Sequence, residues 1–520
     1  MKMILKSGIL AIITSLVGIS LPATAQMRPA NPMAQITNVN QLKDVEPTAW
    51  AYEALRSLVE RYGCIVGYPD QTFRGDRSLT RWEFAAGLNA CLNALERLIQ
   101  DGNNIYQEDI DKIKRLSQEF ATELASIGAR VDKLENRVAF LEDHQFSTTT
   151  KLSGEAVISL YGIAGGEKNG GESIPQVPVL GYRTRIELNT SFTGKDLLYT
   201  RLATGNAPTL VEETGTFQTV LGMAQPDDNA VAVEVLQYSY PVTDNITLVL
   251  EGFGGATDDF ANTLNTLDGD GAFGALSLFG TRNPIYYISG QTGLAFTGNF
   301  NGLDITLGYM AGEGNEPTAG NGLFNGSYSA IAQVGYIPDG ETGIALTYIH
   351  SYNQLDTNTG STRSNFQYFT DTTFGSTPPL SANSLGLQFS AKVFEKIYLG
   401  GWAGYSKANT LASIDGQLGR GSLDIWNWAL TFTVTDLFAE GNRAGIIFGM
   451  QPWVSASTVK LADGQRLQDK DSSYHIEGFY EFILNDNIRL TPGLIVITSP
   501  NYNNNNSTIF QGVLRTTFIF

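Results

Sequence analysis

The spacing of apolar residues changes near residue 150 of the chain. From about residue 151 onward, apolar and polar residues alternate with a period of two, the period of a β-strand with two different faces. An even number of strands suits a closed antiparallel barrel, because closure leaves no unpaired strand edge in lipid. We find sixteen candidate strands, which begin near Leu152, Gly181, Asp196, Ala230, Asn245, Pro284, Leu303, Gly322, Thr342, Ser384, Lys396, Ser422, Ala444, Ser473, Asn487 and Thr508.

The connections between these strands alternate in length. Outer-membrane barrels of bacteria have short periplasmic turns and long outer loops. We therefore expect residues 150–520 to form an all-β transmembrane barrel of 16 antiparallel strands. A soluble β-sandwich is the alternative, but it rarely has polar residues on the face that would be its core. The short turns are expected at Gly194-Lys195, Thr243-Asp244, Pro338-Asp339-Gly340, Glu395-Lys396 and Asn485-Asp486, and the long segments at 205–228, 254–283, 354–379 and 453–468.

The alternation also assigns the two faces of each strand. Arg183 and Arg185 share a polar face that we expect to line the lumen, whereas Ile186 is on the face toward lipid. The final strand ends in Phe520 with an apolar residue at every second position, which resembles the signal read by outer-membrane assembly machinery. The same rule places inside the barrel His475, Glu477 and Glu481.

Residues 105–145 carry a different, helical period. Charged residues fill most of the positions beside a narrow apolar stripe, which predicts a coiled coil. The alternative is a single amphipathic helix packed on the barrel, and the stripe does not determine the number of chains in the coil. A four-residue insertion near Phe120 would locally unwind it. The stripe consists of Ile113, Leu116, Phe120, Leu124, Ile127, Val131, Leu134, Val138 and Leu141.

The N-terminus has the pattern of a secretory signal peptide over residues 1–25. Two lysines, Lys2 and Lys6, precede an apolar stretch, and Ala23-Thr24-Ala25 is a small-x-small cleavage pattern. Residues 26–40 are rich in Asn, Gln and Pro, so we expect a linker there.

Composition excludes several functional classes. The net charge is −18, and the binding of nucleic acid needs a basic face, so no nucleic-acid partner is expected. After residue 25 no apolar run reaches the ~18 residues of a membrane-spanning helix. Only three histidines are present, none in a recognisable catalytic or metal-ligand motif, so we expect no enzyme, no metal and no cofactor.

Residues 41–100 contain two helical patterns around a glycine-rich turn. In the second pattern, Thr80 and Glu83 have the spacing of a capping box. Five pieces occur in the order found in an S-layer homology (SLH) domain, which this segment resembles, although Gln71 and Trp82 replace the usual Gly and Ala. The pieces are Asp44-Val45, Trp50-Ala51, Gly67-Tyr68-Pro69-Asp70, Thr72-Phe73-Arg74 and Thr80-Arg81-Trp82-Glu83.

This resemblance implies binding to a negatively charged, often pyruvylated, polysaccharide attached to peptidoglycan. It gives Arg81 the contact with a carboxylate, which a guanidinium can hold with two parallel hydrogen bonds. The alternative is that Arg81 only pairs with a nearby acidic residue on the surface. The other residues of the binding surface would be Gly67, Tyr68, Asp70 and Trp50.

The two cysteines of the chain, Cys64 and Cys91, both lie in the SLH-like segment. A secreted protein meets an oxidising environment, so a disulfide between them is expected. Closing that loop would add about 3 kcal/mol of stability in the chain-entropy model. Two buried free thiols are the alternative.

The order of the parts, namely signal peptide, SLH-like module, coiled coil and barrel, resembles that of the cyanobacterial outer-membrane porins. Their barrels are similar to the OprB-type carbohydrate-selective porins, and many of them are described as iron-uptake porins. The resemblance implies a homotrimer in outer-membrane lipid that passes small solutes, either carbohydrates or inorganic ions including iron. It also implies that the SLH-like module anchors the outer membrane to the peptidoglycan layer. A structural tether with a largely closed barrel is the alternative function.

The chemistry of such a channel depends on the charges at its narrowest point. The segment 254–283 follows the fifth strand, and the third outer loop folds inward in many porins. We hypothesise that its acids face a basic wall across the constriction and create a transverse field; the alternative is that they line a solvated outer loop. The acids are Asp258, Asp259, Asp268 and Asp270, and the wall consists of Arg183, Arg185 and Arg201.

Overall fold

The computed structural model describes residues 60, 72, 91, 149–168 and 171–520. The chain divides into two compact units, residues 1–145 and 146–520. The signal peptide, the linker and the coiled coil lie outside the described residues. So do Cys64 and the SLH residues Trp50, Gly67, Tyr68, Asp70 and Arg81. Cys91 is described, and it is disulfide-bonded.

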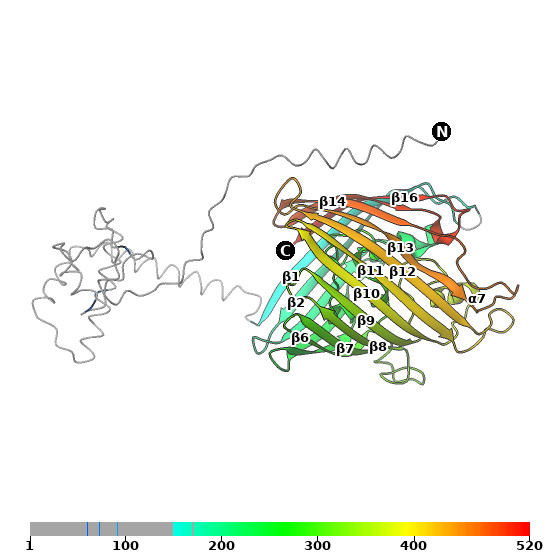
Figure 1. The fold of residues 1–520 in the computed structure, drawn as a ribbon, viewed down its shortest axis with the longest axis horizontal. Helices are drawn as coiled ribbons and strands as arrows, with labels where there is room; N and C mark the ends of the chain where they lie inside the picture. The colour runs from blue at the N-terminus through cyan, green and yellow to red at the C-terminus, as the bar shows by residue number, and fades with distance from the viewer. Residues whose placement is uncertain (1–59, 61–71, 73–90, 92–148, 169–170) are drawn as a thin grey trace, which may run out of the picture. The chain divides into compact units, whose positions relative to one another are not determined.

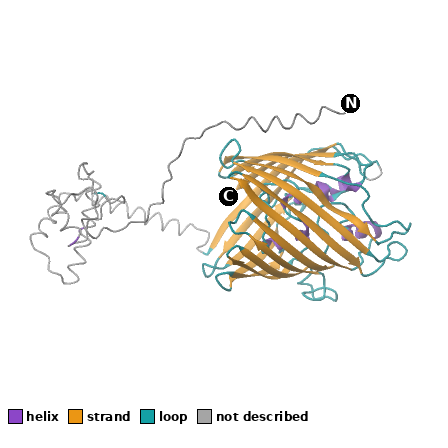
Figure 2. Ribbon diagram, in the orientation of Figure 1, coloured by secondary structure: helices purple, strands orange, loops and turns teal. Residues whose placement is uncertain are grey.

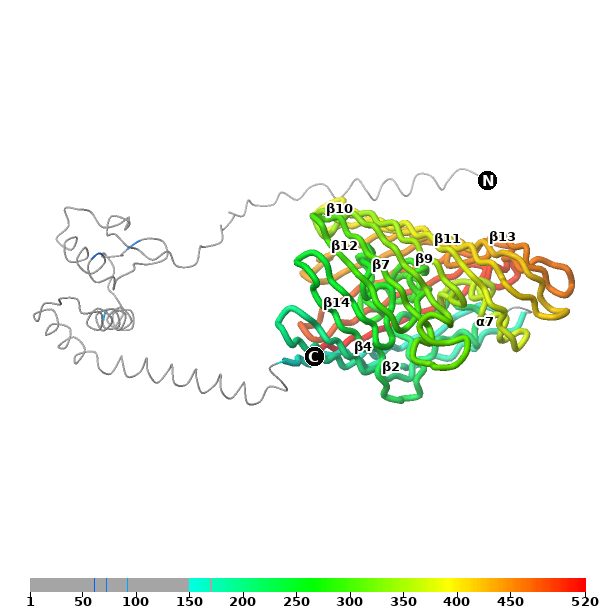
Figure 3. The backbone as a smooth tube through the Cα atoms, turned by 90° about the horizontal axis from the view of Figure 1, so that it is seen from below, coloured from blue at the N-terminus to red at the C-terminus, as the bar shows by residue number. Residues whose placement is uncertain are grey.

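The second unit is a closed barrel of sixteen antiparallel strands, each paired with its neighbours in the chain (Figures 1 and 2). β1 pairs with β16 and closes the ring, as in Glu155↔Ile519 and Ala164↔Phe510. Figure 3 shows the same strands after a quarter turn. The strands are β1 (Thr150–Ala164), β2 (Val179–Thr190), β3 (Leu197–Gly205), β4 (Ala232–Pro241), β5 (Ile246–Phe253), β6 (Thr292–Phe300), β7 (Leu303–Ala311), β8 (Tyr328–Tyr336), β9 (Gly343–Tyr352), β10 (Leu380–Phe394), β11 (Ile397–Thr410), β12 (Ser422–Thr435), β13 (Arg443–Ser457), β14 (His475–Asn485), β15 (Ile488–Ile497) and β16 (Ile509–Ile519).

The strand number and the alternation of short and long connections confirm the sequence prediction. One end of the barrel carries only short turns, such as 242–245 and 395–396. The other end carries eight longer loops, which we number in chain order. They are L1 (165–178), L2 (206–231), L3 (254–291), L4 (312–327), L5 (353–379), L6 (411–421), L7 (458–474) and L8 (498–508).

The predicted start of the sixth strand near Pro284 is wrong, because β6 begins at Thr292. Pro284 instead begins a short 3-10 helix, η5 (Pro284–Tyr287), in L3. Proline suits the first position of a helix because its missing N–H would have had no partner there. The Asn283 side chain caps the same turn by accepting a hydrogen bond from the N–H of Ile285.

The start of β8 is also displaced, from the expected Gly322 to Tyr328. The residues between belong to L4, where Gly320 and Gly322 have φ of +89° and +83°. Such backbone angles favour glycine and do not fit an extended strand.

The two faces of the strands follow the predicted alternation. Arg183 and Arg185 point inward and are buried, whereas outward residues such as Phe510 and Leu514 are about half exposed on the isolated chain. His475, Glu477 and Glu481 are likewise inside and fully buried. None of the helices among the described residues is long and apolar enough to cross a membrane.

The apolar core lies inside the barrel, where loop residues pack against the inner wall. Leu267, Leu276 and Phe279 of L3 are buried in one cluster with the inward residues Phe479 and Val513. Part of the lumen is therefore filled by a packed loop.

Candidate pore constriction

L3 crosses the lumen and is attached to the wall on both sides. On one side, the buried guanidinium of Arg515 in β16 donates hydrogen bonds to three L3 carbonyls: Gly271 at 3.0 Å, Ala275 at 2.9 Å and Gly274 at 2.8 Å. Glu477 of β14 accepts from the backbone N–H of Leu276 at 2.6 Å. These charge-assisted bonds compensate the buried backbone groups of the loop.

On the opposite side, two glutamine side chains hold the start of L3. Gln388 of β10 and Gln333 of β8 each donate from Nε2 to the carbonyl oxygen of Asn262, at 2.9 and 3.0 Å. Gln388 Oε1 also accepts from the N–H of Leu264 at 3.2 Å. Tyr286, further along the loop, donates its hydroxyl to Gln333. L3 therefore crosses the lumen and is hydrogen-bonded to the barrel wall at both sides.

The predicted basic wall meets L3 at Asp270. Arg185 Nη1 lies 2.5 Å from Asp270 Oδ2, and Arg201 Nη1 lies 3.6 Å from the same oxygen. Arg183 donates to the backbone oxygen of Asp270 at 2.7 Å and pairs with Glu155 at 2.9 Å. Half of the Asp270 side-chain surface is still open to the lumen.

The electrostatics of Asp270 follow from this surrounding. Partial desolvation disfavours the ionised form of this half-exposed carboxyl group, but the neighbouring guanidiniums of Arg185, Arg183, Arg282 and Arg201 outweigh that effect and hold the pKa of Asp270 well below its usual range. Asp270 is therefore a permanently charged group, in direct contact with the arginines and not separated from them by an open gap.

Two of the other predicted acids turn away from the basic wall and pair with Arg282 of L3 itself. Asp258 forms a close ion pair with Arg282 Nη1, and Asp268 lies 2.8 Å from Arg282 Nη2. Burial raises the pKa of Asp268 although Arg282 opposes the shift. Arg282 also reaches Asp270 at 3.4 Å, which joins the two groups of charges.

The fourth acid, Asp259, forms a hydrogen bond within its own loop. Its Oδ2 accepts from the N–H of Ala256 at 2.6 Å. Desolvation by the surrounding loop, although the residue is still partly exposed, and the neighbouring charge of Asp258 raise the pKa of Asp259 to about 7. Arg201 and Asp270 are the further charges that act on it.

Sequence reasoning missed three charged members of this site. Glu234 of β4 forms ion pairs with Arg201 and Arg185, whose Nε atoms lie 2.6 and 2.8 Å from its Oε2, and Arg185 Nη2 donates to Glu234 Oε1 at 2.9 Å. Arg282 pairs with the acids of L3. Glu155 could have been found, because it is inward by the alternation of β1 and pairs in register with Arg185. Glu234 lies beside an irregularity in the β3–β4 register and Arg282 lies in a loop, so periodicity does not place either of them.

The charged residues form a continuous series, which we call the charged ladder, between two hollows. Its contacts after Glu234–Arg201 are Arg201–Asp270 at 3.6 Å, Asp270–Arg282 at 3.4 Å and Arg282–Asp268 at 2.8 Å. Asp268 Oδ2 then accepts from the Thr263 hydroxyl at 2.9 Å. Glu234 lines a hollow of about 370 Å³ beside L2, and Thr263 lines a hollow of about 990 Å³ near the short turns.

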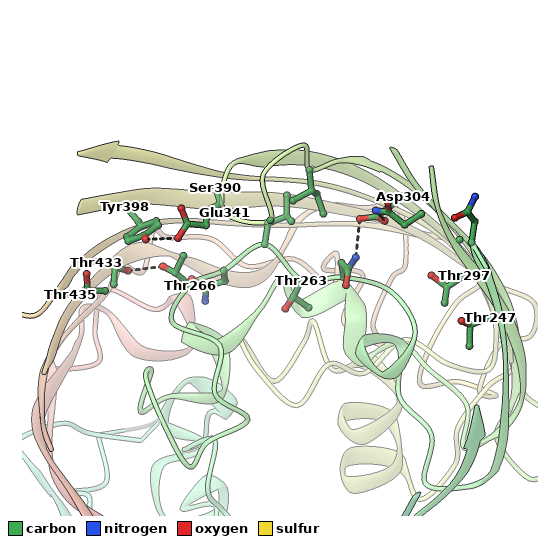
Figure 4. A pocket seen from close by; sticks show the side chains of 18 of the residues that line it. Thr247, Thr263, Thr266, Thr297, Asp304, Glu341, Ser390, Tyr398, Thr433 and Thr435 are labelled. Atoms are coloured by element: carbon green, nitrogen blue, oxygen red, sulfur yellow. Dashed lines mark hydrogen bonds between the residues drawn. The ribbon is translucent and has the colours of Figure 1, made fainter. Parts of the chain in front are cut away.

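The larger hollow, shown in Figure 4, is lined mainly by hydroxyl, amide and carboxylate groups. Thr266 bonds to Thr433 at 2.8 Å, and Tyr398 donates to Glu341 at 3.0 Å. Asp304 and Glu341 lie among its acids, and Arg443 lines it as a cation. Such a surface can form hydrogen bonds with molecules that carry many hydroxyl groups and with the water shell of hydrated ions.

The loops fill another part of the lumen at the long-loop end. Gln218 of L2 is fully buried and donates to Ser473 at 2.8 Å, and its backbone oxygen accepts from Gln451 of β13 at 2.9 Å. Gly360 of L5 donates to Gln451 at 2.9 Å, and Ser361 donates to Asp469 of L7 at 2.6 Å. The smaller hollow lies on another side of the barrel, near β3 to β5, which this network does not fill.

No group of three or more His, Cys, Asp or Glu side chains is arranged to hold a metal ion within the described ranges. The acids of L3 are instead paired with arginines or with the backbone.

The comparisons with known proteins agree with this architecture. The model of the carbohydrate-selective porins of the OprB family matches residues 107–520, and the S-layer homology domain model matches residues 41–85. The chain belongs to the OprB family of porins. It is an outer-membrane protein with an SLH domain, and both parts of the resemblance stated from the sequence are confirmed.

Relatives with the same extent occur in cyanobacteria. An uncharacterised protein of Synechocystis sp. is 40% identical over 516 residues, which cover 94% of this chain and 92% of that protein. One of Nostoc sp. is 36% identical and covers 94% and 86%. The outer membrane protein SlpA of Thermus thermophilus is 38% identical over 109 residues, 20% of this chain and 12% of that protein. The solved structure of Pseudomonas putida OprB matches with a TM-score of 0.47 and 13% identity over 74% of this chain and 96% of that one.

Proposed function

We propose that this porin allows small hydrophilic solutes and ions to diffuse passively between the two hollows, past the charged ladder. The observation that carries the proposal is L3, which crosses the barrel and places paired charges between the hollow at Glu234 and the one at Thr263. Fixed charges at a constriction select solutes by sign and by hydrogen bonding. No cofactor takes part in this mechanism, because diffusion is downhill.

The charges favour cations weakly over anions. Four arginines at the constriction face five carboxylates, so an acidic excess remains. The hydroxyl-rich larger hollow supports carbohydrates as a second solute class, and inorganic ions including iron are the first. The arginines are Arg183, Arg185, Arg201 and Arg282, and the carboxylates are Glu155, Glu234, Asp258, Asp268 and Asp270.

We propose a homotrimer whose subunits meet through the outer face of β1 to β3. The outward residues of these strands are small or aliphatic, with Gly154, Ala156, Gly162 and Thr184 among them. Within these three described strands, Tyr182 is the one aromatic residue on the outward face. Lipid-facing surfaces of barrels carry aromatic belts, so a gap in the belt supports contact with another subunit.

We also propose that the SLH domain anchors the barrel to a polysaccharide linked to peptidoglycan, with Arg81 on a carboxylate of the polymer. The SLH match over residues 41–85 supports this role. The test is binding of the full chain to isolated cell-wall sacculi. Arg81→Ala should release the protein, whereas Arg77→Ala, a nearby substitution of the same kind, should not. Equal binding of both variants would exclude the role of Arg81.

A structural tether with a largely closed barrel is the second candidate, and the network of L2, L5 and L7 in the lumen favours it. Single-channel conductance in a planar bilayer separates the two functions. A channel gives stepwise conductance that survives deletion of residues 41–145. A tether gives no conductance steps even when heat-modifiable migration shows that the barrel is folded. It loses its function when residues 41–145 are deleted.

A further inference from the structure

The outer surface of the barrel has an apolar groove of about 400 Å³ across β6 to β9. Small residues form its floor: Gly308 of β7 and Ala330 and Ala332 of β8. Large apolar residues project on either side, and Leu294 and Leu307 are 43% and 58% exposed on the isolated chain. These outward residues lie on membrane-spanning strands, so the groove must be filled by apolar groups and not by water.

The groove lies in the half of the strands nearest the long loops. Leu294 is the third residue of β6, which starts at Thr292, and Ala330 is the third residue of β8, which starts at Tyr328. Each of these strands begins directly after a long loop, L3 for β6 and L4 for β8. Long loops of such barrels face the cell exterior. The groove therefore belongs to the outer leaflet.

A polar cluster closes the loop end of the groove. The Tyr348 hydroxyl donates to Asn383 Oδ1 at 2.7 Å, and Tyr348 itself lines the groove. His350 Nδ1 lies 3.0 Å from the same oxygen. Because Asn383 Oδ1 is an acceptor, the tautomer of His350 that fits this contact has its proton on Nδ1 and leaves Nε2 as an acceptor. Asn383 offers its amide NH₂ as a donor.

A stack of aromatic rings continues this end. Tyr328 lies between Tyr309 and Tyr352, with ring centroids 5.6 and 6.1 Å apart, and the His350 ring is 6.0 Å from Tyr328. Aromatic residues of this kind mark the level where acyl chains give way to headgroups. The cluster therefore lies at the height of a lipid headgroup.

We propose that this surface is a specific site for one outer-leaflet glycolipid, whose acyl chain fills the groove and whose uncharged sugar meets Asn383 and His350. A sugar hydroxyl donates and accepts, so it matches an amide donor beside an imidazole acceptor. A phosphate oxygen only accepts, and the Nε2 lone pair repels it. Lys407 of β11 lies near Asn383, but it forms an ion pair with Asp424 of β12. Its positive charge is therefore compensated and does not favour a phosphate group.

Lipid fits this face better than a second copy of the chain does. The aromatic belt is dense over β6 to β9, whereas the described strands β1 to β3 carry only Tyr182 outward. An interface between copies would use the surface where the belt is interrupted.

The test is native mass spectrometry of the full-length porin released from nanodiscs. The nanodiscs contain equal amounts of monogalactosyl diacylglycerol and phosphatidylglycerol with identical acyl chains. One galactolipid should be retained per barrel. Ala332→Leu, which fills the groove between Leu307 and Tyr348, should reduce this retention about tenfold. Asn383→Leu should remove the preference for galactolipid over phosphatidylglycerol.

The matched control is Ala403→Leu. Ala403 is also an outward alanine, between Leu387 and Trp428, and it lies outside the groove, so this variant should retain the lipid. Equal retention by Ala332→Leu and Ala403→Leu would overturn the site, as would equal retention of the two lipids by the parent protein. Loss of a complex between copies in Ala332→Leu, without a change in bound lipid, would show that the groove holds a second chain and would also overturn it.

Discussion

Replacing Asp270 by Asn is the sharpest test of the charged ladder. The substitution keeps the shape of the side chain and removes one negative charge, which lies 2.5 Å from Arg185 and 3.4 Å from Arg282. Because half of the Asp270 side chain is open to the lumen, a passing ion can come close to it. The arginines would then lose one of their counterions while Glu155, Glu234, Asp258 and Asp268 remain, and the constriction would become more positive.

The magnitude follows from Coulomb's law. Two unit charges about 4 Å apart interact by about 1 kcal/mol in bulk water and more strongly in a partly desolvated site. One kcal/mol corresponds to about a fivefold change in an equilibrium constant. A cation loses about that factor in Asp270→Asn and an anion gains it, so the cation-to-anion permeability ratio should fall by roughly 25-fold at low salt.

The assay is the reversal potential in a planar bilayer under a tenfold KCl gradient. The control is Asp415→Asn, which removes the same charge from an exposed position in L6. Raising the salt should reduce the effect, because the Debye length falls to about 3 Å at 1 M. An unchanged reversal potential in Asp270→Asn, or an equal change in Asp415→Asn, would refute the view that ions pass along the ladder.

Three further outcomes are expected. The pKa of Asp259 is near 7, so it is neutral below and charged above that value; cation preference measured by reversal potential should rise between pH 6 and 8 and lose this dependence in Asp259→Asn. Arg515→Gln should remove hydrogen bonds to L3 of about 1.5–3 kcal/mol each, so L3 should move more and the single-channel current should become noisier. The control, Arg466→Gln at an exposed position, should leave the current noise unchanged. Equal noise in the two variants would contradict the view that Arg515 holds L3 to the wall. Gly254→Ala should lower the midpoint of heat-modifiable migration more than Gly194→Ala does. Both glycines have positive φ, but a Cβ on Gly254 would lie 1.7 Å from a backbone oxygen and one on Gly194 would meet nothing.

Part of the constriction could be predicted from the sequence because strand alternation is a local property. Arg183 and Arg185 were placed on the lumen face by the period of two, and the structure has them there. The same rule, applied to β1, would have added Glu155. The position of a side chain on a strand thus follows from its parity alone.

Residues of L3 are different, because a loop has no period. The sequence predicts one row of acids opposite the arginines, yet among these acids Asp270 alone contacts the predicted arginines, and Asp258 and Asp268 pair with Arg282. The path of the loop is set by Arg515, Glu477 and Gln388, which reach it from strands more than a hundred residues away in the chain.

The sequence by itself determined that residues 150–520 form sixteen strands with a polar inner face, since the period of the pattern and the alternating loop lengths are written along the chain. The misplaced start of β6 shows its limit, because the apolar residues after Pro284 form a short 3-10 helix of L3 and the strand begins only at Thr292. Only the tertiary structure decided which charges meet at the constriction. Closure of the barrel brings β1 to β4, β14 and β16 around one loop, and the buried ionic groups there are stable only when each finds a partner.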